Sequence, residues 1–183
     1  MESKFSEVNK MTNNDLFHRF RAFSSSMDAL GLGWNGSDVA YFCTPVGAEV
    51  IGWVGVDGIH FCFVPSISSS MVFAVSPMPC DEHYVEPIAH NFQEFLSLVL
   101  FCKGASTLEQ ICYIDEAQFS EMLKSEEEND WLARDAALNT LRKEFGIEAQ
   151  SNAYQYVKII QADFDYSTIP YSEEYYDTLG IER

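Results

Sequence analysis

The sequence lacks every short motif that would name a reaction. It has no phosphate-binding loop, no dinucleotide-binding fingerprint and no cysteine pair spaced as CxxC. The stretch from Val50 to Gly104 carries core-forming residues in place of a nucleophile elbow or a metal signature. Composition and spacing therefore describe a fold and leave the chemistry unassigned.

Positive charge is scarce, because the 183 residues include 11 basic and 28 acidic side chains, giving a net charge of −17. Such a field repels nucleic-acid phosphates and anionic lipid headgroups, so we expect neither nucleic acid nor a membrane as partner. It favours encounter with a basic protein. An acidic surface also keeps an ordinary cytosolic protein in solution, and this second interpretation stays open.

Long apolar runs are absent as well. The longest, around Leu96–Cys102, is far shorter than a membrane span, and the N-terminus lacks the apolar segment of a signal peptide. We therefore expect a cytoplasmic protein, whose odd number of cysteines are reduced and mostly buried. These are Cys43, Cys62, Cys80, Cys102 and Cys112.

The first half of the chain predicts a helix and then strands. An amphipathic helix that packs on a sheet is predicted from the apolar stripe Leu16, Phe20, Phe23 and Met27. Strands are predicted over residues 38–43, 49–56, 59–64 and 71–76.

The turn Asp57-Gly58 is a strong hairpin signal, because a type I′ turn needs positive φ at both positions. It predicts that Val54 lies opposite Phe61 and that Trp53 lies opposite Cys62. Both faces of the hairpin are apolar, which favours a central position covered on both sides.

The second half of the chain predicts helices and a final strand. Cap signals at Asn91, Ser106 and Asp115 each precede a Glu or Gln three residues later, and a further helix runs from Trp131 to Gly146. Residues 154–164 read as a return strand, and no periodicity marks the tail. We predict one α+β domain over residues 1–183, with a mixed, mainly antiparallel sheet flanked by helices. Residues 105–183 then form an extension with helices, the return strand and an acidic tail.

The residue types of a zinc site do occur. His60 and Cys62 share a face of one predicted strand, and Cys80 and His83 follow later. Two nitrogens and two sulfurs would suit tetrahedral zinc, but their spacing is not a recognised zinc pattern. A His and a Cys buried on a covered strand explain the first pair without metal. We therefore expect no metal and no other cofactor.

Nucleophilic catalysis by Cys80 or Cys62, with His83 or His60 as base, would need a thiolate in electropositive surroundings. The net charge of −17 opposes a low thiol pKa. The acidic run over residues 126–130 fits a solvated helix junction better than a catalytic carboxylate pair. The sequence therefore predicts that this protein is not an enzyme.

Acidic and aromatic residues occur together in two places, a combination typical of protein interfaces. Tyr and Trp anchor such contacts, while carboxylates steer a basic partner. The first set is Glu126, Glu127, Glu128, Asp130 and Trp131, and the second is Asp165, Tyr171, Glu173, Glu174, Tyr175 and Asp177. The alternative is that the tail packs on its own domain through its tyrosines, with its acids facing water.

The runs "IGWVGVDGIHFCFVP", "VFAVSP" and "VEPIAHNFQEFLSLVL" resemble the central part of the SUKH superfamily, from Ile51 to Leu100. In that superfamily a hairpin with a Gly-rich turn precedes a strand and a helix of pattern "ia-x-sF-eeFL". The matching positions here are Ile88, Ala89, Phe92, Phe95 and Leu96. The resemblance is one of pattern, without invariant catalytic residues.

This resemblance implies the same α+β fold and a non-catalytic role. Bacterial relatives include immunity proteins that neutralise partner toxins, often nucleases, by direct binding, and fungal relatives regulate cell-wall synthesis. The acidic charge suits a protein that neutralises a basic toxin. Binding surfaces vary in the superfamily, so it assigns no interface residue. Two alternatives stay open: a hydrolase-like enzyme with a pocket near His60, and a small-ligand or metal-binding regulatory domain.

Overall fold

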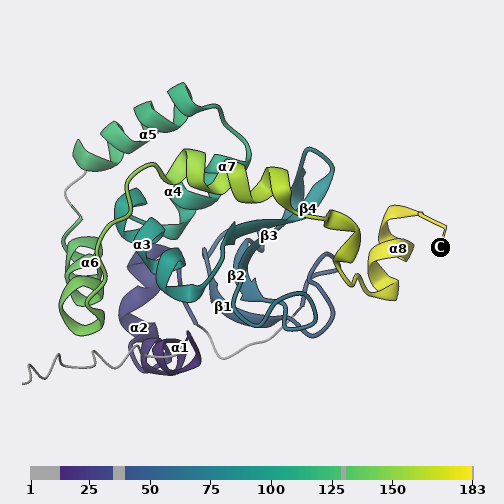
Figure 1. Ribbon diagram of the computed structural model, residues 1–183, viewed down its shortest axis with the longest axis horizontal. Helices are drawn as coiled ribbons and strands as arrows, with labels where there is room; N and C mark the ends of the chain where they lie inside the picture. Colours follow the sequence, from purple (N-terminus) through teal and green to yellow (C-terminus); the bar gives the residue numbers. More distant parts are fainter. Residues whose placement is uncertain (1–12, 35–39, 129–130, 183) are drawn as a thin grey trace, which may run out of the picture.

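The computed structural model describes residues 13–34, 40–128 and 131–182, and a four-stranded antiparallel sheet lies at its centre. The strands are neighbours in chain order: β1 (Glu49–Trp53), β2 (His60–Phe63), β3 (Val72–Cys80) and β4 (His83–Ala89). Most helices gather on one side of the sheet, and the C-terminal segment lies on the other (Figure 1). The predicted α+β fold, a mainly antiparallel sheet flanked by helices in one body, is confirmed.

Short helices precede the sheet, and the longer helices follow it. In chain order the helices and 3₁₀ turns are α1 (Asn13–Arg21), α2 (Ser24–Met27), η1 (Asp28–Leu30), α3 (Phe92–Cys102), α4 (Ala105–Glu109), η2 (Gln110–Cys112), α5 (Glu116–Glu128), α6 (Leu132–Phe145), α7 (Ala153–Asp163), η3 (Tyr166–Thr168) and α8 (Glu173–Leu179). In the described part of the chain, no single helix is long and apolar enough to cross a membrane.

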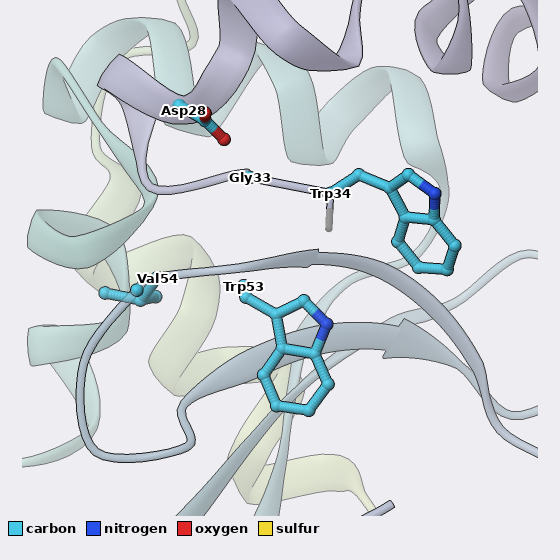
Figure 2. A pocket seen from close by; sticks show the side chains of 6 residues that line it. Asp28, Gly33, Trp34, Trp53 and Val54 are labelled. Carbon is cyan, nitrogen blue, oxygen red and sulfur yellow. The ribbon is translucent and has the colours of Figure 1, made fainter. Parts of the chain in front are cut away.

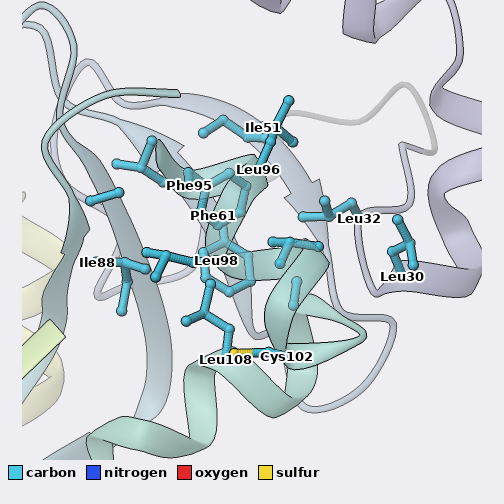
Figure 3. Packing of buried hydrophobic residues seen from close by; sticks show 14 of the residues in the cluster. Leu30, Leu32, Ile51, Phe61, Ile88, Phe95, Leu96, Leu98, Cys102 and Leu108 are labelled. Atoms are coloured by element: carbon cyan, nitrogen blue, oxygen red, sulfur yellow. The ribbon is translucent and has the colours of Figure 1, made fainter. Parts of the chain in front are cut away.

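Helix α3 covers the first face of the sheet. The side chain of Asn91 accepts a hydrogen bond from the backbone N–H of Glu94 at 2.9 Å, which confirms the predicted N-cap. The ring centroid of Phe95 lies 5.0 Å from that of Phe61 on β2 (Figure 3). The buried residues of α3 are Phe92, Phe95, Leu96, Leu98, Val99, Leu100 and Cys102. This helix is therefore the centre of the larger core.

The second face of the sheet is covered by the C-terminal segment, and this closes a smaller core. Its buried residues are Cys43, Cys62, Val64, Phe73, Val75, Val85, Ile169 and Tyr175. Ile169 and Tyr175 come from the tail, which packs across strands β2 to β4. The prediction that the hairpin is covered on both faces is thus confirmed for β2, whereas β1 lies at the sheet edge.

The predicted hairpin register is wrong by two residues. Trp53 lies opposite His60, and Gly52 lies opposite Phe61. Asp57 (φ 51°) and Gly58 (φ 73°) do have the predicted positive φ, but Gly55 (φ 96°) lengthens the loop. Residues 54–59 therefore connect the strands, and a hydrogen bond from the N–H of Val54 to the carbonyl of Ile59 at 2.9 Å closes the loop.

The predicted N-terminal helix is divided into two helices. The stripe is buried at Leu16, Phe20 and Met27, but the helix is interrupted at Ala22 and Phe23, between α1 and α2. It packs on α3 as well as on the sheet. The predicted strand over residues 38–43 is wrong where it can be compared, because residues 40–41 are irregular and residues 42–43 lie in a turn. Residues 38–39 lie outside the described part.

The predicted return strand over residues 154–164 is wrong, because residues 154–163 belong to helix α7 and Phe164 follows its end. Ala153, Val157 and Ile160 are buried at spacings of four and three residues, and this face packs along β4 and α3. The tail also contains η3 and α8, although no helical period was predicted there. Aromatic and β-branched side chains favour strands by propensity, and tertiary packing overrides that preference here.

Two other predicted helix boundaries are confirmed, and one is wrong. Asp115 and Gln118 each bond the other's backbone N–H, at 2.8 Å and 3.0 Å, so that capping box is confirmed. Gly146 (φ 65°) ends α6 in the left-handed conformation, as predicted. The cap predicted at Ser106 is wrong, because α4 begins directly after Gly104 without a side-chain cap.

Gly52 is required by a close approach of two backbone segments. A Cβ atom there would lie 2.8 Å from the carbonyl carbon of Leu32, whose segment runs beside the outer edge of β1. We expect Gly52→Ala to lower the free energy of unfolding by about 1–3 kcal/mol through overpacking. Urea titration measures this. Gly47→Ala is unsuitable as a control because its φ is positive, so Ala48→Gly serves instead and should cost less.

Candidate functional site

The first predicted acidic and aromatic set lies where α5 ends and α6 begins. Glu126 accepts from the guanidinium of Arg134 through its carboxylate, and through its carbonyl at 2.8 Å. The guanidinium carbon of Arg134 lies 5.4 Å from the ring centroid of Trp131, so one buried arginine joins both residues. Glu127 and Glu128 end α5, but their side chains lie outside the description, as does Asp130.

Two neighbouring large apolar side chains are exposed at the same junction. Trp131 is 59% exposed and Leu132 is 83% exposed. A Trp of this exposure beside a carboxylate fits the predicted interface chemistry. This part of the surface is bounded, however, by residues 129–130, which the structure does not describe.

The second predicted set is divided between two faces of the tail. Tyr171 and Tyr175 stack with ring centroids 3.7 Å apart. The ring of Tyr175 also stacks with that of Phe42, which lies in the loop before β1. Glu173, Glu174 and Asp177 are exposed on α8, and Asp165 is exposed at η3. The tyrosines therefore anchor the tail to its own domain, while the carboxylates face water. This arrangement matches the alternative weighed from the sequence.

The carboxylate of Asp165 has a structural role. It accepts from the backbone N–H of Ser167 at 3.1 Å and from the Ser167 hydroxyl at 2.6 Å, which caps the 3₁₀ turn η3. This carboxylate therefore stabilises the local fold of the tail.

An aromatic pocket of about 440 Å³ opens beside the outer edge of β1. Gly33 pairs with Trp53 through two backbone hydrogen bonds, of 3.0 Å and 2.8 Å, and so brings the loop after η1 to this edge. Figure 2 shows the indoles of Trp34 and Trp53 and the carboxylate of Asp28 around the opening. The lining residues are Asp28, Gly33, Trp34, Trp53, Val54 and Gly55. Sequence reasoning placed a candidate pocket near His60 and Trp53 but missed Asp28 and Trp34, although a Trp inside the glycine-rich loop "GLGWNGS" was a usable signal.

His60 lies behind this pocket and does not line it. Its ring packs 4.3 Å from that of Trp53, Nδ1 lies 2.9 Å from the carbonyl of Gly58, and Nε2 lies 3.3 Å from the Thr44 hydroxyl. Complete burial lowers the pKa of His60 below its usual value. A buried histidine of this kind supports the loop geometry. The pocket therefore lies near His60, as the alternative prediction has it, but Trp53 and not His60 lines it.

The cysteine and histidine candidates do not come together as a metal site. Within residues 13–34, 40–128 and 131–182, no group of three or more His, Cys, Asp or Glu side chains is placed to hold an ion. Burial raises the pKa of Cys62 and raises that of Cys80 to about 11, so both thiols stay protonated at neutral pH. His83 stacks on Tyr166 with ring centroids 3.7 Å apart.

A buried polar cluster lies instead between β4, α4, α7 and η3. Glu86 is 6% exposed and accepts from the Tyr166 hydroxyl at 2.6 Å. Burial raises the pKa of Glu86 to about 7, although the Tyr166 hydrogen bond and Lys158 both act to lower it. Burial also raises the pKa of Glu109, whose Oε1 finds no hydrogen-bond partner in the described chain. A carboxyl with the pKa of Glu86 suits proton transfer. Its hydrogen bond to Tyr166, however, also gives Glu86 a structural role in fixing the tail.

Comparison of this chain with protein families, with curated proteins and with solved structures finds no match.

Proposed function

We propose that this chain is a cytoplasmic, non-catalytic binding protein of the SUKH-like immunity type, which neutralises a basic toxin by direct contact. The supporting observation is the outward face of α8, where Glu173, Glu174 and Asp177 are exposed. Since 28 carboxylates share the chain with 11 cationic side chains, most of them have no cation to pair with one-to-one. Such a face attracts a basic partner over the screening length of the solution.

The surroundings of the candidate nucleophiles support a binding protein rather than an enzyme. Burial raises the pKa of the Cys62 and Cys80 thiols, and His60 is enclosed behind Trp53. These groups lack the exposed, activated state that a hydrolase needs. We therefore propose a binding protein in which α8 steers the partner. The tyrosines of the tail anchor that tail to its own domain.

Charge reversal on α8 tests the proposal. We expect the chain to capture one stoichiometric basic protein from lysate of its own source and to release it at moderate salt. Glu174→Lys/Asp177→Lys should slow association at low salt by about tenfold or more, because it removes steering. Surface plasmon resonance with the captured protein, identified by mass spectrometry, measures this.

The matched control is Glu144→Lys/Glu148→Lys, which changes the net charge equally near the end of α6. These residues are exposed, and α6 and α8 lie at opposite ends of the molecule (Figure 1). The control should slow association less than the α8 variant does. Equal effects of both variants would count against α8 as the contact surface, and binding that ignores salt would contradict the steering mechanism.

A further inference from the structure

The aromatic pocket at β1 combines the groups that recognise a planar cation. Two indoles and one carboxylate line it, from Trp34, Trp53 and Asp28 (Figure 2). Indole faces attract guanidinium and ammonium groups through their quadrupole, and a carboxylate adds a charge-assisted hydrogen bond. The remaining lining comes from the small or apolar residues Gly33, Val54 and Gly55, which leave room for a side chain.

The carboxylate of Asp28 lies directly beside Gly33 at the pocket. A Cβ atom on Gly33 would lie 2.3 Å from Oδ1 of Asp28, so the carboxylate rests directly against the glycine. Within the described residues this carboxylate makes no ion pair and no side-chain hydrogen bond. An exposed, available anion beside two indoles is the charge complement of a cation.

Trp34 already stacks one guanidinium within the fold. The guanidinium carbon of Arg21 lies 3.6 Å from the Trp34 ring centroid, while Arg21 also contacts the ring of Phe17 and the carbonyl of Val50. Arg21 is thus engaged by its own neighbours and is not part of the pocket lining. Its geometry shows that this indole accepts a planar cation at stacking distance.

We propose that the pocket receives an arginine side chain of a basic protein partner. Its guanidinium stacks on the indoles of Trp34 and Trp53 and pairs with the carboxylate of Asp28. Arginine fits better than lysine because its planar, weakly hydrated head stacks on aromatic rings and bonds a carboxylate with two N–H groups. The inference rests on the proposed function. It adds to that function a specific anchoring site, which is separate from the steering carboxylates of α8.

The three indole N–H resonances of the chain offer a direct test by NMR. Nα-acetyl-arginine amide is titrated into ¹⁵N-labelled protein, and Nα-acetyl-citrulline amide provides the uncharged probe of nearly equal shape. We expect saturable shifts of the Trp34 and Trp53 signals with arginine, at a Kd on the order of 1 mM for one isolated side chain. Trp131 is the internal reference, because it is an exposed indole outside the pocket.

Asp28→Asn should weaken arginine binding about threefold to tenfold, since it removes the anion and keeps the shape. Asp163→Asn, an exposed carboxylate at the end of α7, is the matched control and should leave binding unchanged. Equal shifts with citrulline, equal shifts at Trp131, or an unaffected Asp28→Asn variant would each overturn the proposal.

The outcomes separate this inference from the proposed function. If the arginine probe fails while salt-sensitive capture of a basic protein persists, the pocket assignment is wrong and the proposed function stands. If the probe binds but no basic protein is captured, the proposed function fails and guanidinium recognition by the pocket stands. With the captured partner in hand, Asp28→Asn should speed its dissociation, whereas the α8 variant should slow its association.

Discussion

A chain cut after Phe164 is expected to lose about 4 kcal/mol or more of its free energy of unfolding. The cut removes Ile169 and Tyr175, two buried side chains that are each worth about 1.5–3 kcal/mol in apolar burial. It also removes part of the cover over Val75 and Val85 on the second face of the sheet, while Phe164 keeps its contact with Phe73. Because single domains are stable by only about 5–15 kcal/mol, this loss leaves little margin.

Thermal and urea unfolding measure the effect, and binding of a hydrophobic dye should rise as the second face is exposed. The control is a chain cut after Ile181, which keeps the buried residues of the tail. In the full chain, Ile169→Ala should be more costly than Thr168→Ala, because Thr168 is exposed. A truncated chain with unchanged stability and no added dye binding would contradict the role of the tail as a cover.

The second large effect is a pH-dependent stabilisation by Glu86→Gln. Folding raises the pKa of Glu86 from about 4.5 to about 7, so between these values the folded state holds more protons than the unfolded state. The stability of the natural chain therefore falls as pH rises through this interval. The variant has no such loss, so at pH 8 it should be more stable by about 3 kcal/mol.

The difference should shrink toward zero below about pH 4.5, where the carboxyl is neutral in both states. The glutamine can still accept the Tyr166 hydrogen bond, so the change isolates the charge. His60 has a lowered pKa and contributes the opposite slope, which is common to both chains and cancels. Glu82→Gln, at the exposed turn of the same hairpin, is the control, and a difference that stays constant with pH would refute the prediction.

Sequence reasoning worked best where local chemistry determines structure. The Asn91 cap, the Asp115–Gln118 capping box and the glycine after α6 are short-range signals with defined hydrogen bonds or backbone angles. The dense apolar face of α3 likewise identified the core helix. These features need no knowledge of distant contacts.

It failed where distant contacts decide. Residues of α7 have strand-forming side chains, yet burial against β4 and α3 selects the helix. The hairpin register was missed because Gly55 joined the loop, although both turn residues were identified. Strand β4 was not predicted, since Pro87 and the charged Glu86 obscure its alternation.

The candidate site was predicted in part. Exposed carboxylates at Glu173, Glu174 and Asp177 follow from composition, but the inward turn of Tyr171 and Tyr175 depends on the packing of the tail. The pocket formed by Asp28, Trp34 and Trp53 joins a loop to a strand edge. No spacing rule foresees that pairing, because it depends on the close approach that Gly52 permits.

The position of the tail cover in the chain bears on biosynthesis. Strand β4 ends at Ala89, and the residues that cover its second face begin at Phe164, about 75 residues later. At about 5–20 residues per second, a ribosome needs roughly 4–15 s to make that interval. During this time Phe73 and Val75 lack their final cover, and a nascent sheet with such a face is a substrate for chaperones. Slow codons between these two points would prolong that exposure.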